Sequence, residues 1–109
     1  YYIIENPRGM MRKMPQLKEF KPFLQTPWYC QYGDKRAKPT DIWSNVNWKS
    51  KRCKPNSQTC NHERAPRGSK TGTQGVKGAY NRSIVPEELC VDICNAIINN
   101  KGTLQTTLF

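Results

Sequence analysis

Hydrophobic positions gather near the two ends of this chain, and a long polar stretch separates them. Near the start, the β-branched residues Ile3 and Ile4 run directly into polar residues, a pattern that favours a strand buried on both faces. Pro7 lacks a backbone N–H and cannot continue a ladder, so we expect the strand to end there. Glu5 and Asn6 would then lie at its carboxyl end, where open α/β sheets bind their ligands.

Short elements are predicted between this strand and residue 45. Apolar residues at helical spacing suit two short helical turns that are broken at Pro15, and a proline-containing connector follows. Residues 28–32 are rich in aromatic side chains, which favours a second strand, and Ile42 with Trp43 indicates another. A Gly-Asp turn lies between these segments, so we expect residues 28–45 to form a β-hairpin.

The clearest predicted element is a helix near the end of the chain. Pro86 precedes two glutamates, which is a typical helix start. Leu89, Ile93 and Ile97 then fall on one apolar face, and the sequence Asn-Asn-Lys-Gly provides a stop signal. We therefore expect a helix over residues 86–99, followed by a tail or a last edge strand.

Residues 46–82 differ from the rest of the chain in composition. They carry nine basic residues against one acidic residue, which is +8 of the net charge of +10 on 109 residues. Almost no aliphatic side chains occur here, so the stretch cannot bury a core of its own. Long polar loops of this kind are usually functional or disordered. The chain therefore divides into a sheet segment, a basic loop and a helical segment, at residues 1–45, 46–82 and 83–109.

The charge balance indicates the kind of partner. With 18 basic against 8 acidic residues, the chain is suited to a polyanion; the alternative is a generally basic surface. Glycines and hydroxyl side chains punctuate the basic loop, which suits close contact with phosphates. The order Gly-x4-Gly-Lys-Ser/Thr is absent, so we exclude binding of a nucleoside triphosphate by a Walker loop. The predicted DNA-binding residues are Arg8, Lys49, Lys51, Arg52, Lys54, Arg64, Arg67, Lys70 and Lys77.

A candidate metal site lies in the same loop. Cys53, Cys60 and His62 occur within ten residues, and zinc binds thiolate and imidazole ligands tetrahedrally. A hydrophobic share of 36% allows only a modest core, and small chains of this kind often need a metal to fold. The fourth ligand must come from elsewhere, and Cys30 is the candidate. The alternative is two free cysteines and a surface histidine.

The cysteine count and the lack of a visible leader indicate the compartment. Five cysteines are an odd number, which argues against a secreted disulfide framework and favours reduced thiols or metal ligands. The N-terminus lacks the basic region and apolar core of a signal peptide. No apolar run approaches the roughly 18 residues of a membrane span. We therefore expect a cytoplasmic protein without a membrane partner.

Four sequence blocks resemble the carboxyl-terminal half of phage-type cytosine-5 DNA methyltransferases. The first is Ile4-Glu5-Asn6-Pro7-Arg8-Gly9, and the second is Tyr-Cys-Gln-Tyr-Gly-Asp-x-Arg-x-Lys-Pro-Thr-Asp-Ile-Trp at residues 29–43. The third is Ala-Pro-Arg-Gly-Ser-x-Thr-Gly-Thr-Gln-Gly at residues 65–75, and the fourth is Arg-Ser-x-x-Pro-x-x-Leu-Cys at residues 82–90. The resemblance spans residues 2–98. It implies an α/β or α+β fold, an incomplete methyltransferase-like sheet fragment with a β-hairpin, a long basic loop region and a C-terminal helix.

The resemblance implies catalytic roles for Glu5, Asn6 and Arg36. In the family the matching glutamate holds the exocyclic amine and ring nitrogen of the flipped cytosine, which makes carbon 6 more electrophilic. Asn6 would shape the same loop, and Arg36 resembles an arginine that contacts the substrate pocket. Gln31 is too far from Arg36 to complete the family's Gln-x-Arg-x-Arg pattern. On local sequence alone, a salt-bridged carboxylate at a sheet edge remains the alternative for Glu5.

The basic loop, residues 46–82, corresponds by position to the family's target-recognition segment, which reads the DNA around the flipped base. The family's glycine-rich S-adenosylmethionine loop and its Pro-Cys nucleophile are absent from these 109 residues. Cys30 follows Tyr29 rather than a proline, so we interpret Cys30 as structural or zinc-linked. S-adenosylmethionine would therefore bind only the full-length enzyme.

These observations lead to one interpretation with one alternative. The chain is interpreted as the DNA-binding, base-recognising C-terminal portion of a DNA cytosine-5 methyltransferase. It would not be catalytically competent alone. Its expected location is the cytoplasm of a phage-infected or bacterial cell. Expected partners are double-stranded DNA and either a second copy of the chain or the missing catalytic half. The alternative is a stand-alone, zinc-stapled basic module that binds DNA or a partner protein without catalysis.

Overall fold

The computed structural model describes residues 1–54, 60, 62 and 79–100, and the structural statements below concern these residues. They form three strands, three 3-10 helices, which are labelled η, and two α-helices. In chain order these elements are β1 (Ile3–Pro7), η1 (Met10–Lys13), η2 (Pro15–Phe23), β2 (Leu24–Gln25), η3 (Tyr29–Tyr32), β3 (Thr40–Ser44), α1 (Ala79–Ser83) and α2 (Glu87–Asn100). This mixture of helices and an antiparallel sheet is an α+β arrangement, which is one of the two predicted fold classes.

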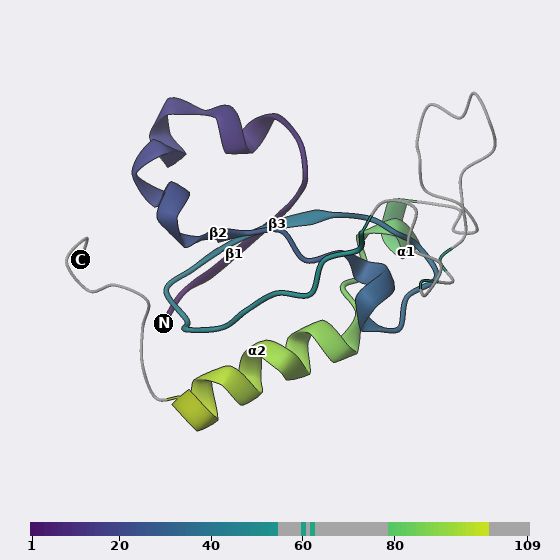
Figure 1. The fold of residues 1–109 in the computed structure, drawn as a ribbon. Helices are drawn as coiled ribbons and strands as arrows, with labels where there is room; N and C mark the ends of the chain where they lie inside the picture. Colours follow the sequence, from purple (N-terminus) through teal and green to yellow (C-terminus); the bar gives the residue numbers. More distant parts are fainter. Residues whose placement is uncertain (55–59, 61, 63–78, 101–109) are drawn as a thin grey trace.

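The sheet has three antiparallel strands in the order β1-β3-β2, so β3 is its central strand. All five residues of β3 are buried, because η1 and η2 arch over one face of the sheet and α2 covers the other (Figure 1). Successive side chains of a strand point to opposite faces. Ile42 accordingly belongs to the core cluster with α2, whereas its neighbour Trp43 faces the η1–η2 arch.

The prediction that the Ile3–Ile4 strand is buried on both faces is wrong. Strand β1 forms, and it ends at Pro7 as expected, but its place is the edge of the sheet. Ile3 lies opposite Ser44 and Ile4 opposite Trp43, and β1 pairs with no second described strand. The Ile3 side chain is therefore 48% exposed and the Ile4 side chain 38% exposed.

The predicted β-hairpin over residues 28–45 is also wrong. Residues 29–32 form the 3-10 helix η3, and β3 pairs with β1 and β2 instead. The only link of hairpin type among the described residues is an isolated bridge between Trp28 and Pro39. A helix with three residues per turn places residues i and i+3 on one side. Tyr29 and Tyr32 are both buried in this way, so the aromatic side chains serve a helix rather than a strand.

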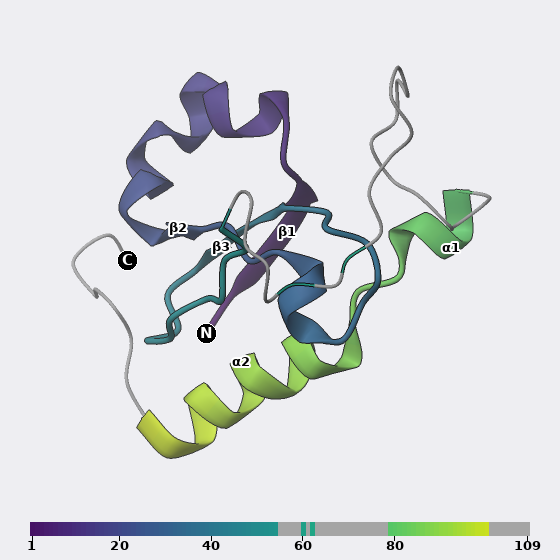
Figure 2. The same ribbon diagram turned by 45° about the vertical axis from the view of Figure 1, so that its right-hand side comes forward.

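The remaining predictions of secondary structure agree closely with the structure. The two helical turns before residue 24 are η1 and η2, which are separated at Met14. Helix α2 spans Glu87–Asn100, one residue later at each end than expected, and its residues Leu89 and Ile93 are buried in the core. Figure 2 shows that α2 lies along the sheet face away from η1 and η2. The core cluster consists of Tyr29, Tyr32, Ile42, Val46, Trp48, Leu89 and Ile93.

Two further predictions concern segments that the structure describes only in part or not at all. The expected tail or edge strand after residue 102 lies outside the described residues, as does most of the basic loop. Among the residues that are described, no helix has the length and apolar character needed to cross a membrane.

Candidate metal centre

The four predicted metal ligands come together in the structure. The Sγ atoms of Cys30, Cys53 and Cys60 and a ring nitrogen of His62 all lie within 4.8 Å of one another, an arrangement that could hold a metal ion. Cys30 belongs to η3, and the other three belong to the segment that follows the sheet. The group thus joins residues that are 32 positions apart at the extremes of Cys30 and His62.

Backbone contacts explain how Cys53 reaches Cys30. The Trp28 N–H, at the start of η3, donates to the carbonyl of Lys51 at 3.1 Å. The Lys51 N–H in turn donates to the hydroxyl oxygen of Tyr32, at the end of η3, at 2.9 Å. Both ends of the short helix therefore hold the same residue, two positions before Cys53. This fixes the extended segment alongside η3 and brings the two thiols together.

The four side chains are close and mostly shielded from solvent. The distance from Cys60 Sγ to His62 Nδ1 is 3.0 Å, and that from Cys53 Sγ to the same nitrogen is 3.7 Å. Cys53 is buried, and the other three are half-buried. The site therefore lies just below the surface, where an ion could reach it and water would have limited access.

The protein environment makes the three thiols unequal. Burial is the main factor that raises the pKa of Cys30 to about 12, and burial also raises the pKa of Cys53. Burial would raise the pKa of Cys60 too, but hydrogen bonds with the side chain and backbone of His62 outweigh it and lower this pKa to about 7. Cys60 is therefore the thiol that ionises most readily near neutral pH, and a thiolate is the form that binds a metal.

One contact of the centre was not predicted from the sequence. The side-chain amide of Gln31 donates to Cys30 Sγ at 3.8 Å. An amide donor next to a sulfur ligand stabilises its thiolate and fixes its orientation. The only signal in the sequence is that Gln31 follows Cys30 directly, and this signal needs the η3 geometry to be interpreted. The two other cysteines, Cys90 and Cys94, lie exposed on α2 and take no part in the group.

Comparisons of the chain with protein-family models, with curated proteins and with solved structures find no match. Its function must therefore be argued from the arrangement of its own residues.

The residues with predicted catalytic roles occupy different surroundings. Glu5 is exposed on β1, and its Oε1 accepts a hydrogen bond from the Thr40 hydroxyl at 2.8 Å. The Asn6 amide donates to the carbonyl of Pro7 at 3.0 Å. These two side chains thus lie on the edge strand, close to its carboxyl end.

Arg36 is only 3% exposed. Its guanidinium forms an ion pair with Asp34 at 2.5 Å, and it donates to the carbonyl of Ile84 at 3.0 Å. These contacts tie the loop after η3 to the segment that leads into α2. They give Arg36 a clear structural role, and its catalytic role stays a prediction.

The predicted DNA-binding residues are exposed wherever the structure describes them. This group comprises Arg8, Lys49, Lys51, Arg52 and Lys54. The ammonium group of Lys51 lies over the Tyr32 ring, 5.3 Å from its centroid. The other predicted residues, Arg64, Arg67, Lys70 and Lys77, lie outside the described residues.

Proposed function

We propose that this chain is a zinc-stapled module that binds double-stranded DNA. The observation that carries the proposal is the convergence of three thiols and one imidazole from η3 and from the start of the basic loop. Sulfur and nitrogen donors in a group of four are the ligand set that zinc prefers. Zinc would therefore anchor the first part of the basic loop to η3.

The geometry of the group fits a tetrahedral zinc ion. With Zn–S bonds of about 2.3 Å and Zn–N bonds of about 2.0 Å, ligand atoms lie roughly 3.5 to 3.8 Å apart. The 3.7 Å between Cys53 Sγ and His62 Nδ1 matches this spacing. The 3.0 Å between Cys60 Sγ and His62 Nδ1 is a hydrogen-bond distance, and it would lengthen slightly when the metal replaces the proton.

Metal content provides the first test. We expect the purified protein to contain about one zinc ion per chain, and Cys60→Ala to lose it together with part of its thermal stability, because metal binding contributes folding free energy. Elemental analysis and a thermal melt measure the two effects. The matched control is Cys94→Ala, which removes an exposed cysteine outside the group and should keep the metal. Less than about half an equivalent of zinc in the unmodified protein would contradict the proposal.

The proposed ligand is DNA because the basic side chains around the centre are exposed. Four exposed basic residues flank Cys53, namely Lys49, Lys51, Arg52 and Lys54. The sequence that follows is also strongly basic. Lys and Arg bind DNA mainly through its phosphates, which releases counterions and makes the affinity depend steeply on salt. A zinc ion that holds Cys53 and Cys60 would restrict where these bases lie.

Salt dependence provides the second test. We expect the zinc-loaded protein to bind a mixed-sequence duplex with an affinity that falls by at least about tenfold between 50 and 200 mM salt. Fluorescence anisotropy of a labelled duplex measures this. The Cys60→Ala variant should bind more weakly than the Cys94→Ala control, because its basic loop is no longer held by the zinc ion. An affinity that stays constant over this salt range would rule out binding through phosphates.

A role within a cytosine-5 DNA methyltransferase is the second candidate function. The observation that favours it is the exposed Glu5 on the edge strand, whose carboxylate is oriented by Thr40, within the block that resembles the family's Glu-Asn motif. The test is the reading frame upstream of the codon for Tyr1. A glycine-rich cofactor loop and a Pro-Cys dipeptide in frame would support it. If both are missing, the stand-alone DNA-binding module is the better interpretation.

A further inference from the structure

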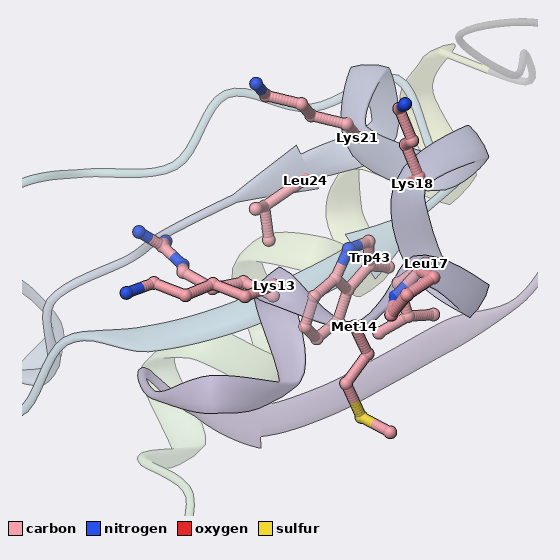
Figure 3. Close-up of a pocket in the computed structure, with 9 residues that line it drawn as sticks. Lys13, Met14, Leu17, Lys18, Lys21, Leu24 and Trp43 are labelled. Atoms are coloured by element: carbon pink, nitrogen blue, oxygen red, sulfur yellow. The ribbon is translucent and has the colours of Figure 1, made fainter.

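A pocket of about 590 Å³ lies between the η1–η2 arch and the face of the sheet that carries Trp43. Its floor is apolar and includes Trp43, Leu17 and Leu24, and all of its charged lining residues are basic. Figure 3 shows the side chains of Lys13 and Lys18, with that of Lys21, arranged around the Trp43 indole. None of the described acidic residues lines the pocket. None of these three lysines is among the residues predicted from the sequence to bind DNA.

The 3-10 geometry of η2 explains why two of these lysines lie together. In a helix with three residues per turn, residues i and i+3 are aligned on one side. Lys18 and Lys21 have this spacing, whereas Glu19, the one acidic residue of η2, is offset by a third of a turn and does not line the pocket. Lys13 comes from the neighbouring helix η1, so three positive charges meet over one apolar floor.

The charges of these lysines are not neutralised within the described part of the chain. Lys13, Lys18 and Lys21 are exposed, and none forms an ion pair with a described residue. Arg12, which also lines the pocket, differs from them. Its guanidinium forms an ion pair with the buried carboxylate of Asp41 at 2.6 Å, which fixes η1 on β3. The positive charge offered to a ligand is therefore that of the lysines.

Two smaller pockets adjoin this one and have the same character. One, of about 380 Å³, shares Arg12 and Lys13 with it and adds Arg8. The other, of about 320 Å³, shares Leu24 and is lined by two further bases of the segment after the sheet. Within the part of the chain that the structure describes, neither is lined by an acidic residue. We call the three together the basic surface. Its cationic residues are Arg8, Arg12, Lys13, Lys18, Lys21, Lys49 and Arg52.

We propose that the basic surface binds the phosphate backbone of DNA and extends the contact region from the first residues of the basic loop, Lys49 and Arg52, to the lysines of η1 and η2. The inference rests on the proposed function and specifies where on the described part of the chain the DNA lies. The basic side chains extend over three adjoining open pockets. This arrangement suits a ligand with repeated negative charges better than a single small anion. Lysine stems cover apolar surface while their ammonium groups remain in solvent, so the apolar floor supports the row of charges.

The test compares two variants that change the net charge equally. Lys18→Gln with Lys21→Gln removes two positive charges from the basic surface. Asn95→Asp with Asn99→Asp adds two negative charges to exposed positions of α2, on the opposite side of the sheet (Figure 1). Both zinc-loaded variants are titrated with the same duplex at several salt concentrations, and circular dichroism checks that they are folded.

We expect the lysine variant to lower the slope of log affinity against log salt by about 1.8, since each phosphate contact contributes about 0.9. Its affinity at 0.1 M salt should fall by roughly 10-fold to 60-fold, whereas the α2 variant should keep nearly the full slope. In NMR spectra, duplex DNA should shift the Trp43 indole N–H resonance, which is assigned with Trp43→Phe.

Three outcomes would overturn the inference, and they are distinguishable. If the unmodified protein binds DNA steeply but the lysine variant does so equally well, the basic surface is not the contact region and the proposed function stands. If the two variants lose the same slope, only net charge matters. If polyglutamate but not DNA shifts Trp43, the surface binds an acidic peptide. A failure of the unmodified protein to bind DNA at all would instead refute the proposed function.

Discussion

Gly33 is the residue at which η3 ends, and its backbone has a φ of 82°. This left-handed conformation is readily adopted by glycine but costs other residues roughly 1 kcal/mol or more. A Cβ atom at this position would also lie 2.6 Å from Glu88 Oε1. Gly33 therefore lets the chain turn sharply out of η3 while α2 packs closely against the turn. The position of Cys30 within η3 depends on this turn.

Substitution of Gly33 tests this account. We expect Gly33→Ala to lower the free energy of unfolding by about 1 to 2 kcal/mol, because the left-handed backbone becomes strained while the Glu88 side chain can move aside. Denaturant unfolding measures the loss. The matched control is Gly9→Ala, where φ is −178° and a Cβ would meet only Pro7 O at 3.7 Å. Equal stability of the two variants would contradict the argument.

At the level of single residues, the sequence predicts which chemical groups form a site better than it predicts where side chains lie in the fold. The group of candidate metal ligands could be predicted because thiols and imidazoles in a core-poor segment have few other roles. Cys30 could be included because a tetrahedral zinc site would require a fourth ligand. The cluster of lysines on η1 and η2 could not be predicted, because single lysines in a basic chain give no signal until the fold brings them together.

The elements are joined by a small number of polar contacts as well as by the core. Among these, Arg36 forms an ion pair with Asp34 and donates to the carbonyl of Ile84, which links the loop after η3 to the segment that leads into α2. Burial would raise the pKa of the Asp34 carboxyl, but hydrogen bonds and charge attraction from Arg36 outweigh this and hold the pKa below its ordinary value. The carboxylate form is therefore favoured by folding.

The direction of this pKa shift can be tested by measuring stability as a function of pH. A carboxyl group whose pKa is lowered in the folded state contributes stability above its unfolded pKa of about 3.8 and loses it as the pH falls through the folded value. We expect Asp34→Asn to be less stable by about 2 kcal/mol near neutral pH, with the difference vanishing in strong acid. Denaturant unfolding from pH 7 to pH 2 measures it.

If a metal is bound, its release in acid affects both proteins and cancels in this comparison. The exposed substitution Glu19→Gln serves as the control and should leave the pH profile close to that of the unmodified protein. The difference in unfolding free energy for Asp34→Asn could also persist unchanged at a pH below the folded pKa of Asp34. That result would show that the pair stabilises the fold through packing and hydrogen-bond geometry rather than through charge.

At the level of elements, long-range context decides what the local pattern leaves open. Helix α2 is predicted to within one residue at each end, because its start signal and apolar face are both local. Residues 28–32 are mistaken for a strand, since aromatic side chains three apart fit a buried 3-10 helix equally well. A nine-residue 3-10 helix such as η2 is uncommon, so the alignment of Lys18 with Lys21 has no basis in the sequence alone.

For the whole molecule, the sheet order is the feature that sequence reasoning misses. A pair of β-branched residues is typical of a central strand, yet Ile3 and Ile4 lie at the edge, and the central strand is β3 with its polar residues Thr40 and Asp41. Burial of Asp41 is made tolerable by its ion pair with Arg12. The choice between edge and centre depends on which strands pair, and no local pattern records that choice.

Among the described residues, the sheet also lies between a basic cluster and an acidic cluster. The basic surface lies on the η1–η2 side and around the adjoining edge, whereas Glu87, Glu88 and Asp92 line a pocket on α2. These described charges contribute an electric dipole component that runs across the sheet. The field of a polyanion would exert a torque on such a dipole and turn its positive side forward before contact. Productive encounters would thus be more frequent than random collisions allow, and this advantage would fade as added salt shortens the range of the field.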